Sequence, residues 1–179
     1  MRRVACLAVV AALLGCTAAH AYPKRPDGPV LDLANILPAA DEAALNQRLT
    51  KYLGRSGNAL VVVSVNSLEG QSIENYAFGL FNEWGIGDAK TDRGLLILVA
   101  PAEHKVRIEV GCGLEGRITN EVAGTVIREE MIPSYQSGDL EGGTLAGIDS
   151  LLAKLDAPAT ANDNVRITPV CRAKAKAAA

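Results

Sequence analysis

The clearest pattern in the chain is a long apolar segment followed by a strictly alternating one. Residues 94–100 read GLLILVA, which is typical of a strand buried on both faces. Residues 106–110 alternate Val, Ile and Val with Arg107 and Glu109, which is typical of a half-buried strand. Because only the short polar segment 101–105 separates them, the two strands are predicted to form an antiparallel hairpin.

Further patterns predict the elements around this hairpin. Before the hairpin we expect a short strand over 30–33, a helix that starts at Asp41, a central strand over 59–65 and a helix from Ser72 to Trp84. The first of these helices has an apolar face of Leu45, Leu49, Tyr52 and Leu53, and Trp84 of the second is expected in the core. After the hairpin we expect a helix from Thr119 that ends at Pro133 and a last helix from Asp139 to Leu155. A strand, a helix and a second strand form a right-handed parallel crossover. With the antiparallel hairpin added, we expect a three-layer α/β/α sandwich around a small mixed central sheet.

Composition narrows the class of protein. The chain has 179 residues, which suits one domain with short extensions. Hydrophobic residues make up 49% but aromatics only 4%, so the core must consist mainly of Val, Ile, Leu and Ala. The formal net charge is −2 and no basic stripe is present, which argues against a nucleic-acid partner.

The N-terminal residues 1–21 are predicted to be a secretion signal. Arg2 and Arg3 form its charged region, an apolar run follows, and Ala19-His20-Ala21 fits cleavage before Tyr22. Leu13-Leu14-Gly15-Cys16 also resembles a bacterial lipobox, in which Cys16 would be lipidated, and the sequence leaves both cuts open. Either one places the protein in the bacterial periplasm, soluble or lipid-anchored, with contact to the membrane only through that anchor.

Two cysteines, Cys112 and Cys171, lie outside the predicted signal. In an oxidising compartment they would pair, although a buried thiol at 112 and an incidental thiol at 171 fit the sequence equally well. The domain is predicted to span 22–155. Residues 156–179, rich in Ala and Lys without periodicity, are predicted to be a largely disordered tail, in which 165–170 would add a strand if Cys171 is bonded.

Acidic residues are the candidates for chemistry, since no known catalytic motif is present and His104 falls in the hairpin turn. Carboxylates and an amide follow or precede the predicted strands at Asp32, Asp92, Glu115 and Asn120. Such oxygen groups suit Ca²⁺ or Mg²⁺ if they converge. From the residues alone they are better explained as solvated loop acids, caps or turn formers.

Several blocks of the sequence resemble the TPM domain, the family named for thylakoid lumen, photosystem-repair and MOLO-type proteins. They are GPVLDLANILP, WGIG, RGLLILVA, KVRIEVG, GLEGRIT and IPSYQSGDLEGG. The resemblance implies divalent cation binding by acids at the positions of Asp32, Asp92 and the segment that follows the glycine-rich GLEG. Relatives usually carry Asn or Asp where Arg93 precedes Gly94.

Arginines around the same loops suggest a second ligand. Arg93 and Arg117 flank the acids and would suit a phosphate group. Members of the family are described as acid phosphatases, which such an arrangement would explain. We expect a module that binds a divalent cation and an envelope or membrane protein. The alternatives are a weak metal-dependent acid phosphatase and a structural envelope protein without a ligand.

Overall fold

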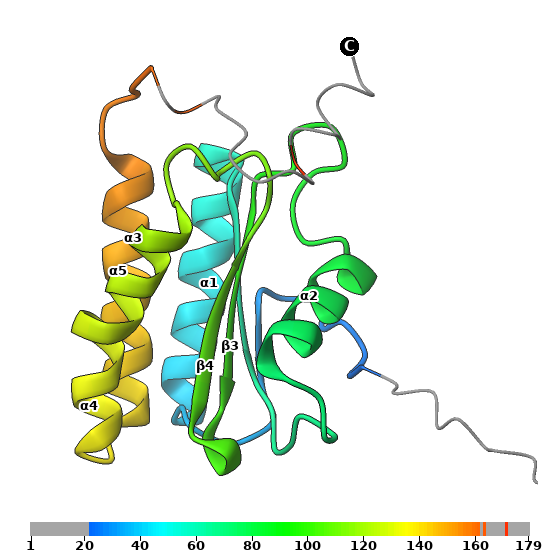
Figure 1. The fold of residues 1–179 in the computed structure, drawn as a ribbon, viewed down its shortest axis with the longest axis vertical. Helices are drawn as coiled ribbons and strands as arrows, with labels where there is room; N and C mark the ends of the chain where they lie inside the picture. The colour runs from blue at the N-terminus through cyan, green and yellow to red at the C-terminus, as the bar shows by residue number, and fades with distance from the viewer. Residues whose placement is uncertain (1–21, 162, 164–170, 172–179) are drawn as a thin grey trace, which may run out of the picture.

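A four-stranded mixed sheet forms the centre of the molecule in the computed structural model, which describes residues 22–161, 163 and 171 (Figure 1). Its strands are β1 (Val30–Asp32), β2 (Ala59–Ser64), β3 (Gly94–Ala100) and β4 (Lys105–Val110), in that order across the sheet. The first three are parallel, and β4 runs antiparallel to β3 with Ile97 opposite Ile108. The predicted hairpin and mixed sheet are therefore confirmed.

Helices cover both faces of this sheet, so the three-layer prediction is confirmed (Figure 1). The helical elements are α1 (Ala39–Ser56), α2 (Ile73–Trp84), the short 3-10 helix η1 (Pro101–Glu103), α3 (Asn120–Thr125), the π-helix η2 (Val126–Met131), α4 (Ile132–Gln136) and α5 (Leu140–Asp156). Helix α2 packs on one face, with Trp84 buried there as predicted. Helices α1, α3 and α5 pack on the other.

The apolar sequence of β3 explains why two separate cores exist. All seven of its residues are buried, and successive side chains of a strand point to opposite faces. Leu95, Ile97 and Val99 pack against α1 and α5, whereas Leu96 and Leu98 pack against α2. A strand with a helix layer on each face needs this continuous apolar run.

Two sequence predictions about the helices are wrong. The third helical segment does not end at Pro133 but continues through α4, with Pro133 in its first turn. The N–H of Ile132 donates to the carbonyl of Ile127, five residues back, and this wider turn leaves room for the proline ring. Leu53 is 47% exposed rather than part of the apolar face of α1. Helix α1 also begins at Ala39, which places Asp41 within its first turn.

The segment before β1 lies along α2. The ring of Tyr22 meets that of Tyr76 edge-on, with centroids 5.1 Å apart. The indole N–H of Trp84 donates to the carbonyl of Pro23 at 2.9 Å, and Arg25 donates to the carbonyl of Trp84. The chain is thus fixed to the domain from Tyr22 onward. The predicted signal, the predicted strand over 165–170 and most of the predicted tail lie outside the described residues.

Alkaline pH should weaken the contact between α4 and α5. Burial raises the pKa of Tyr135 to about 12, while its hydroxyl pairs with Thr144 at 2.8 Å. Because an unfolded tyrosine titrates near pH 10, the unfolded state loses its proton first, and stability falls between about pH 10 and 12 by up to about 2 kcal/mol. Urea unfolding of wild type and Tyr135→Phe at pH 9 and 11 checks this. An equal loss in both proteins would contradict it.

Candidate functional site

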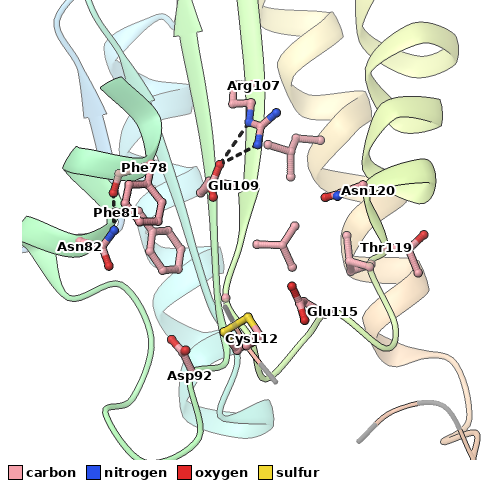
Figure 2. Close-up of a pocket in the computed structure, with 15 residues that line it drawn as sticks. Phe78, Phe81, Asn82, Asp92, Arg107, Glu109, Cys112, Glu115, Thr119 and Asn120 are labelled. Carbon is pink, nitrogen blue, oxygen red and sulfur yellow. Dashed lines mark hydrogen bonds and ion pairs between the residues drawn. A yellow bond between two sulfur atoms is a disulfide. The ribbon is translucent and has the colours of Figure 1, made fainter. Parts of the chain in front are cut away.

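A pocket of about 240 Å³ lies beside the end of β4, between α2 and the start of α3 (Figure 2). It is lined by Phe78, Phe81 and Asn82 of α2, Asp92, residues 107–112 of β4 and the turn after it, Glu115, Ile118, Thr119, Asn120 and Cys171. Charged side chains of both signs therefore share one opening with two phenylalanine rings. Phe78 is 58% exposed, which is unusual for such a large apolar side chain.

Close backbone packing holds the two loops of the pocket together. The N–H of Gly113 donates to the carbonyl of Asp92 at 2.8 Å. A Cβ atom at Gly113 would lie 2.1 Å from the carbonyl oxygen of Thr91, so a side chain cannot be accommodated there without moving the loop. Asp92 itself has a left-handed backbone, with φ 54°. The glycine-rich sequence after β4 thus brings this loop against the loop that carries Asp92.

Three of the four predicted cation ligands line this pocket. Asp92 comes from the loop before β3, Glu115 from the loop after β4, and Asn120 is the first residue of α3. Glu115 is only 6% exposed. In the view of Figure 2 the disulfide lies between Asp92 and Glu115. Within residues 22–161, 163 and 171, no group of three or more His, Cys, Asp or Glu side chains is placed to hold a metal ion.

The fourth predicted ligand, Asp32, lies at the opposite end of the sheet. It ends β1 and is level with Ser64 of β2 and Val99 of β3, whereas Asp92 precedes the first residue of β3. Its carboxylate accepts hydrogen bonds from the N–H groups of Ile36 (3.1 Å) and Leu37 (2.8 Å) and from the hydroxyl of Ser64. The structure does not bring Asp32 to the pocket, and its contacts give it a role in folding.

The two arginines predicted to bind phosphate also do not line the pocket. The Nε–H of Arg93 donates to the side chain of Asn58 at 2.7 Å. Arg117 donates to the carbonyl of Ala157 at 2.9 Å, to that of Leu155 and to the carboxylate of Asp163, and so holds the end of α5. The guanidinium that does line the pocket belongs to Arg107.

Cys112 and Cys171 form a disulfide in the structure, with their Cα atoms 5.3 Å apart. Both residues are buried and line the pocket. The bond attaches Cys171, near the end of the chain, to the turn that follows β4. It therefore forms part of the pocket wall.

A family model for the TPM domain, whose label also carries the word phosphatase, matches residues 30–154. The chain belongs to the TPM domain family. This match covers β1 through almost all of α5, so the pocket lies within the family domain apart from Cys171. No curated protein matches the chain.

Solved structures of similar fold support the same assignment. The N-terminal domain of a protein from P. gingivalis is 31% identical, with a TM-score of 0.66 over 71% of this chain and 81% of that one. The BA42 protein of Bizionia argentinensis is 19% identical, with a TM-score of 0.60 over 76% and 94%. The N-terminal domain of cg2496 from Corynebacterium glutamicum is 16% identical, with a TM-score of 0.58 over 78% and 88%. The last two show the fold alone.

Sequence reasoning about this TPM domain missed several pocket residues. Phe78 falls outside the inward face of α2, so its helical position gave no signal of a site. Arg107 lies on the polar side of the alternating strand, and it pairs with Glu109 at 3.0 Å. The Arg107–Glu109 pair also lines the pocket. Only the position of β4 at the edge of the sheet could have indicated this.

The part of the chain that the structure describes contains no helix that is both long and apolar enough to cross a membrane. Cys16 and the rest of the predicted signal of this TPM domain lie outside that part.

Proposed function

We propose that this TPM domain is an exported binding module of the bacterial cell envelope. Its pocket would bind Ca²⁺ or Mg²⁺ through Asp92, Glu115 and Asn120, and its surface would bind an envelope or membrane protein. The signal sequence at residues 1–21 would deliver it to the periplasm, as a soluble protein or anchored through Cys16. One observation carries the cation proposal, namely that three oxygen-bearing residues from three separate segments line one pocket.

The chemistry of the pocket suits a hard cation held weakly. Two carboxylates and one amide are oxygen donors of the kind that calcium takes, and calcium fills its remaining positions with backbone carbonyls and water. Since the described residues provide no group of three acidic, His or Cys side chains, we expect a dissociation constant on the order of 10⁻⁴ to 10⁻³ M.

A second candidate function is a weak acid phosphatase. It is favoured by Arg107, because a guanidinium in the same pocket as the proposed cation would bind a phosphate group. The label of the family model points the same way. Hydrolysis of p-nitrophenyl phosphate that is lost in Arg107→Ala would support this function. A structural envelope protein without a ligand is the third candidate.

Calcium titration by calorimetry tests the cation proposal. Asp92→Asn should weaken binding about tenfold or more, because it removes one of the two charges that face the cation. Asp27→Asn is the matched control, since it makes the same charge change on an exposed residue outside the pocket. Mg²⁺ is titrated in parallel.

The outcomes separate the three functions. Saturable binding that Asp92→Asn weakens and Asp27→Asn leaves intact supports the proposed cation site. Equal affinity in all three proteins would show that the cation binds elsewhere. No binding at millimolar calcium, together with no phosphate hydrolysis, would leave a domain whose role rests on protein contacts or on structure alone.

A further inference from the structure

The outer side of β4 carries backbone groups that face away from the sheet. In an antiparallel pair of strands, the backbone N–H and C=O groups of one residue bond to the neighbouring strand, and those of the next residue point away from it. The N–H of Gly111 donates to the carbonyl of Gly94, so Glu109, Arg107 and Lys105 bond to β3. Residues 106, 108 and 110 then point outward. Among the described residues, no hydrogen bond is made to the backbone groups of these three.

The other edge of the sheet is protected. Strand β1 has only three residues, and the side chain of Asn46 on α1 accepts a hydrogen bond from the N–H of Val30 at 3.0 Å. Short edges and covering side chains are the usual devices that prevent strand pairing. Strand β4 has six residues, and in the part of the chain that the structure describes no side chain makes such a covering bond to it, so we treat it as the open edge of the sheet.

Two hollows lie along the open edge, and we call them together the groove. The one near the disulfide is the 240 Å³ pocket already described. The one near the hairpin turn has a volume of about 590 Å³ and is lined by Glu74 of α2, by Lys105 and Val106 of β4, and by residues of η2, α4 and α5. Figure 1 shows β4 with α2 on one side and α3 and α4 on the other. An extended segment laid on β4 would therefore contact both helical layers.

We propose that this groove binds an extended peptide segment of a protein partner, which adds to β4 as an antiparallel fifth strand with alternating apolar and charged residues. Main-chain hydrogen bonds to Val106, Ile108 and Val110 would supply the affinity, as in other cases of strand addition. The inference deepens the proposed binding function and rests on it for the existence of a protein partner, but it does not require the cation.

The side chains of β4 specify the partner's chemistry. Val106, Ile108 and Val110 pack with the core on the α1 side, so apolar partner residues suit that face. On the α2 side the row reads Lys105, Arg107, Glu109, and opposite charges across strands are favourable. An antiparallel partner should place acids opposite Lys105 and Arg107 and a base opposite Glu109. The hexapeptide Val-Lys-Ile-Glu-Val-Glu has this order.

The shape of the edge favours a single peptide strand over a second copy of the chain. Both hollows along β4 are lined by residues of α2 on one side and by residues of α3 or α4 on the other, so a helical wall flanks the edge on each side. Strands must approach to about 4.8 Å to form hydrogen bonds. If two copies approached each other, the helices that flank β4 in each copy would collide before the two β4 edges met. A single extended peptide has no flanking helices.

Amide exchange followed by NMR tests the proposal on the full processed chain. In the free protein the N–H groups of Val106, Ile108 and Val110 should exchange fast, and saturating Val-Lys-Ile-Glu-Val-Glu should slow them about tenfold or more. Val106→Pro removes one outward N–H without a loss of bonds to β3, and should weaken binding about tenfold. Val106→Ala keeps that N–H and should weaken binding far less than Val106→Pro does.

Charge order provides a second, matched comparison. The peptide Val-Glu-Ile-Lys-Val-Glu has the same composition and net charge but exchanges the two central charges. Wild type should prefer the first peptide by several-fold, since each cross-strand ion pair contributes up to about 1 kcal/mol. The double variant Arg107→Glu/Glu109→Arg keeps its internal ion pair and should reverse this preference.

Several results would overturn the proposal. One is slow exchange of the three amides before any peptide is added, which would mean that a second copy or the chain's own remaining residues occupy the edge. The others are equal binding of both peptides and full binding by Val106→Pro. If the protein binds calcium but neither peptide, the proposed cation site is supported and only the proposal of strand addition is contradicted.

Discussion

The double substitution Cys112→Ala/Cys171→Ala is expected to lower the free energy of unfolding by about 4 kcal/mol. The disulfide joins residues separated by 59 positions, and a bond across so long a loop removes much of the conformational freedom of the unfolded chain. The total free energy of unfolding of a domain of this size is only about 5 to 15 kcal/mol. The bond would therefore supply a large share of its stability.

Urea unfolding with and without a reductant measures this effect. The wild type should lose stability on reduction, whereas the double variant should unfold at the same urea concentration in both conditions. The oxidised wild type should contain no reactive thiol from this pair. Two reactive thiols at Cys112 and Cys171 in protein recovered from an oxidising compartment would contradict the prediction.

Asp32→Ala should destabilise the domain by about 3 kcal/mol without changing its affinity for calcium. The substitution deprives the N–H groups of Ile36 and Leu37 and the hydroxyl of Ser64 of their shared acceptor. Hydrogen bonds to a charged group contribute about 1.5 to 3 kcal/mol each and are not additive. Ile36 and Leu37 are buried, so water cannot fully replace the carboxylate.

Two variants make this measurement specific. Asp32→Asn keeps one acceptor oxygen and should lose less stability than Asp32→Ala, and Asp27→Ala removes an exposed carboxylate and should change little. Urea unfolding gives the stabilities, and calorimetry gives the calcium affinities. A stable Asp32→Ala protein that has lost calcium binding would place Asp32 in a cation site after all.

Much of the fold follows from local sequence patterns, because the patterns reflect burial. The apolar run of β3 and the alternation of β4 match their positions between two helical layers and at the edge of the sheet. The end of the third helical segment could not be predicted from the sequence pattern. The π-turn at residues 126–131 depends on how that segment packs against α5, and it has no simple sequence signal.

The candidate site was only partly predictable for a different reason. Asp92, Glu115 and Asn120 line the same pocket because strand order brings their loops to one end of the sheet. Asp32 is the last residue of its strand, whereas Asp92 precedes its strand, so the parallel arrangement of β1 and β3 places Asp32 at the other end of the sheet. Arg93 and Arg117 lie near the loops in sequence, but their side chains turn away to bind Asn58 and the end of α5.

The docking of Tyr22 and Pro23 on α2 limits how far the domain could travel from a membrane. If Cys16 carries a lipid, only six peptide units separate the anchored residue from Tyr22, whose ring is fixed against Tyr76. A fully extended chain spans at most about 3.6 Å per residue, or about 20 Å in all. An anchored domain would therefore search only the layer next to the bilayer, and partners deeper in the periplasm would lie beyond its reach.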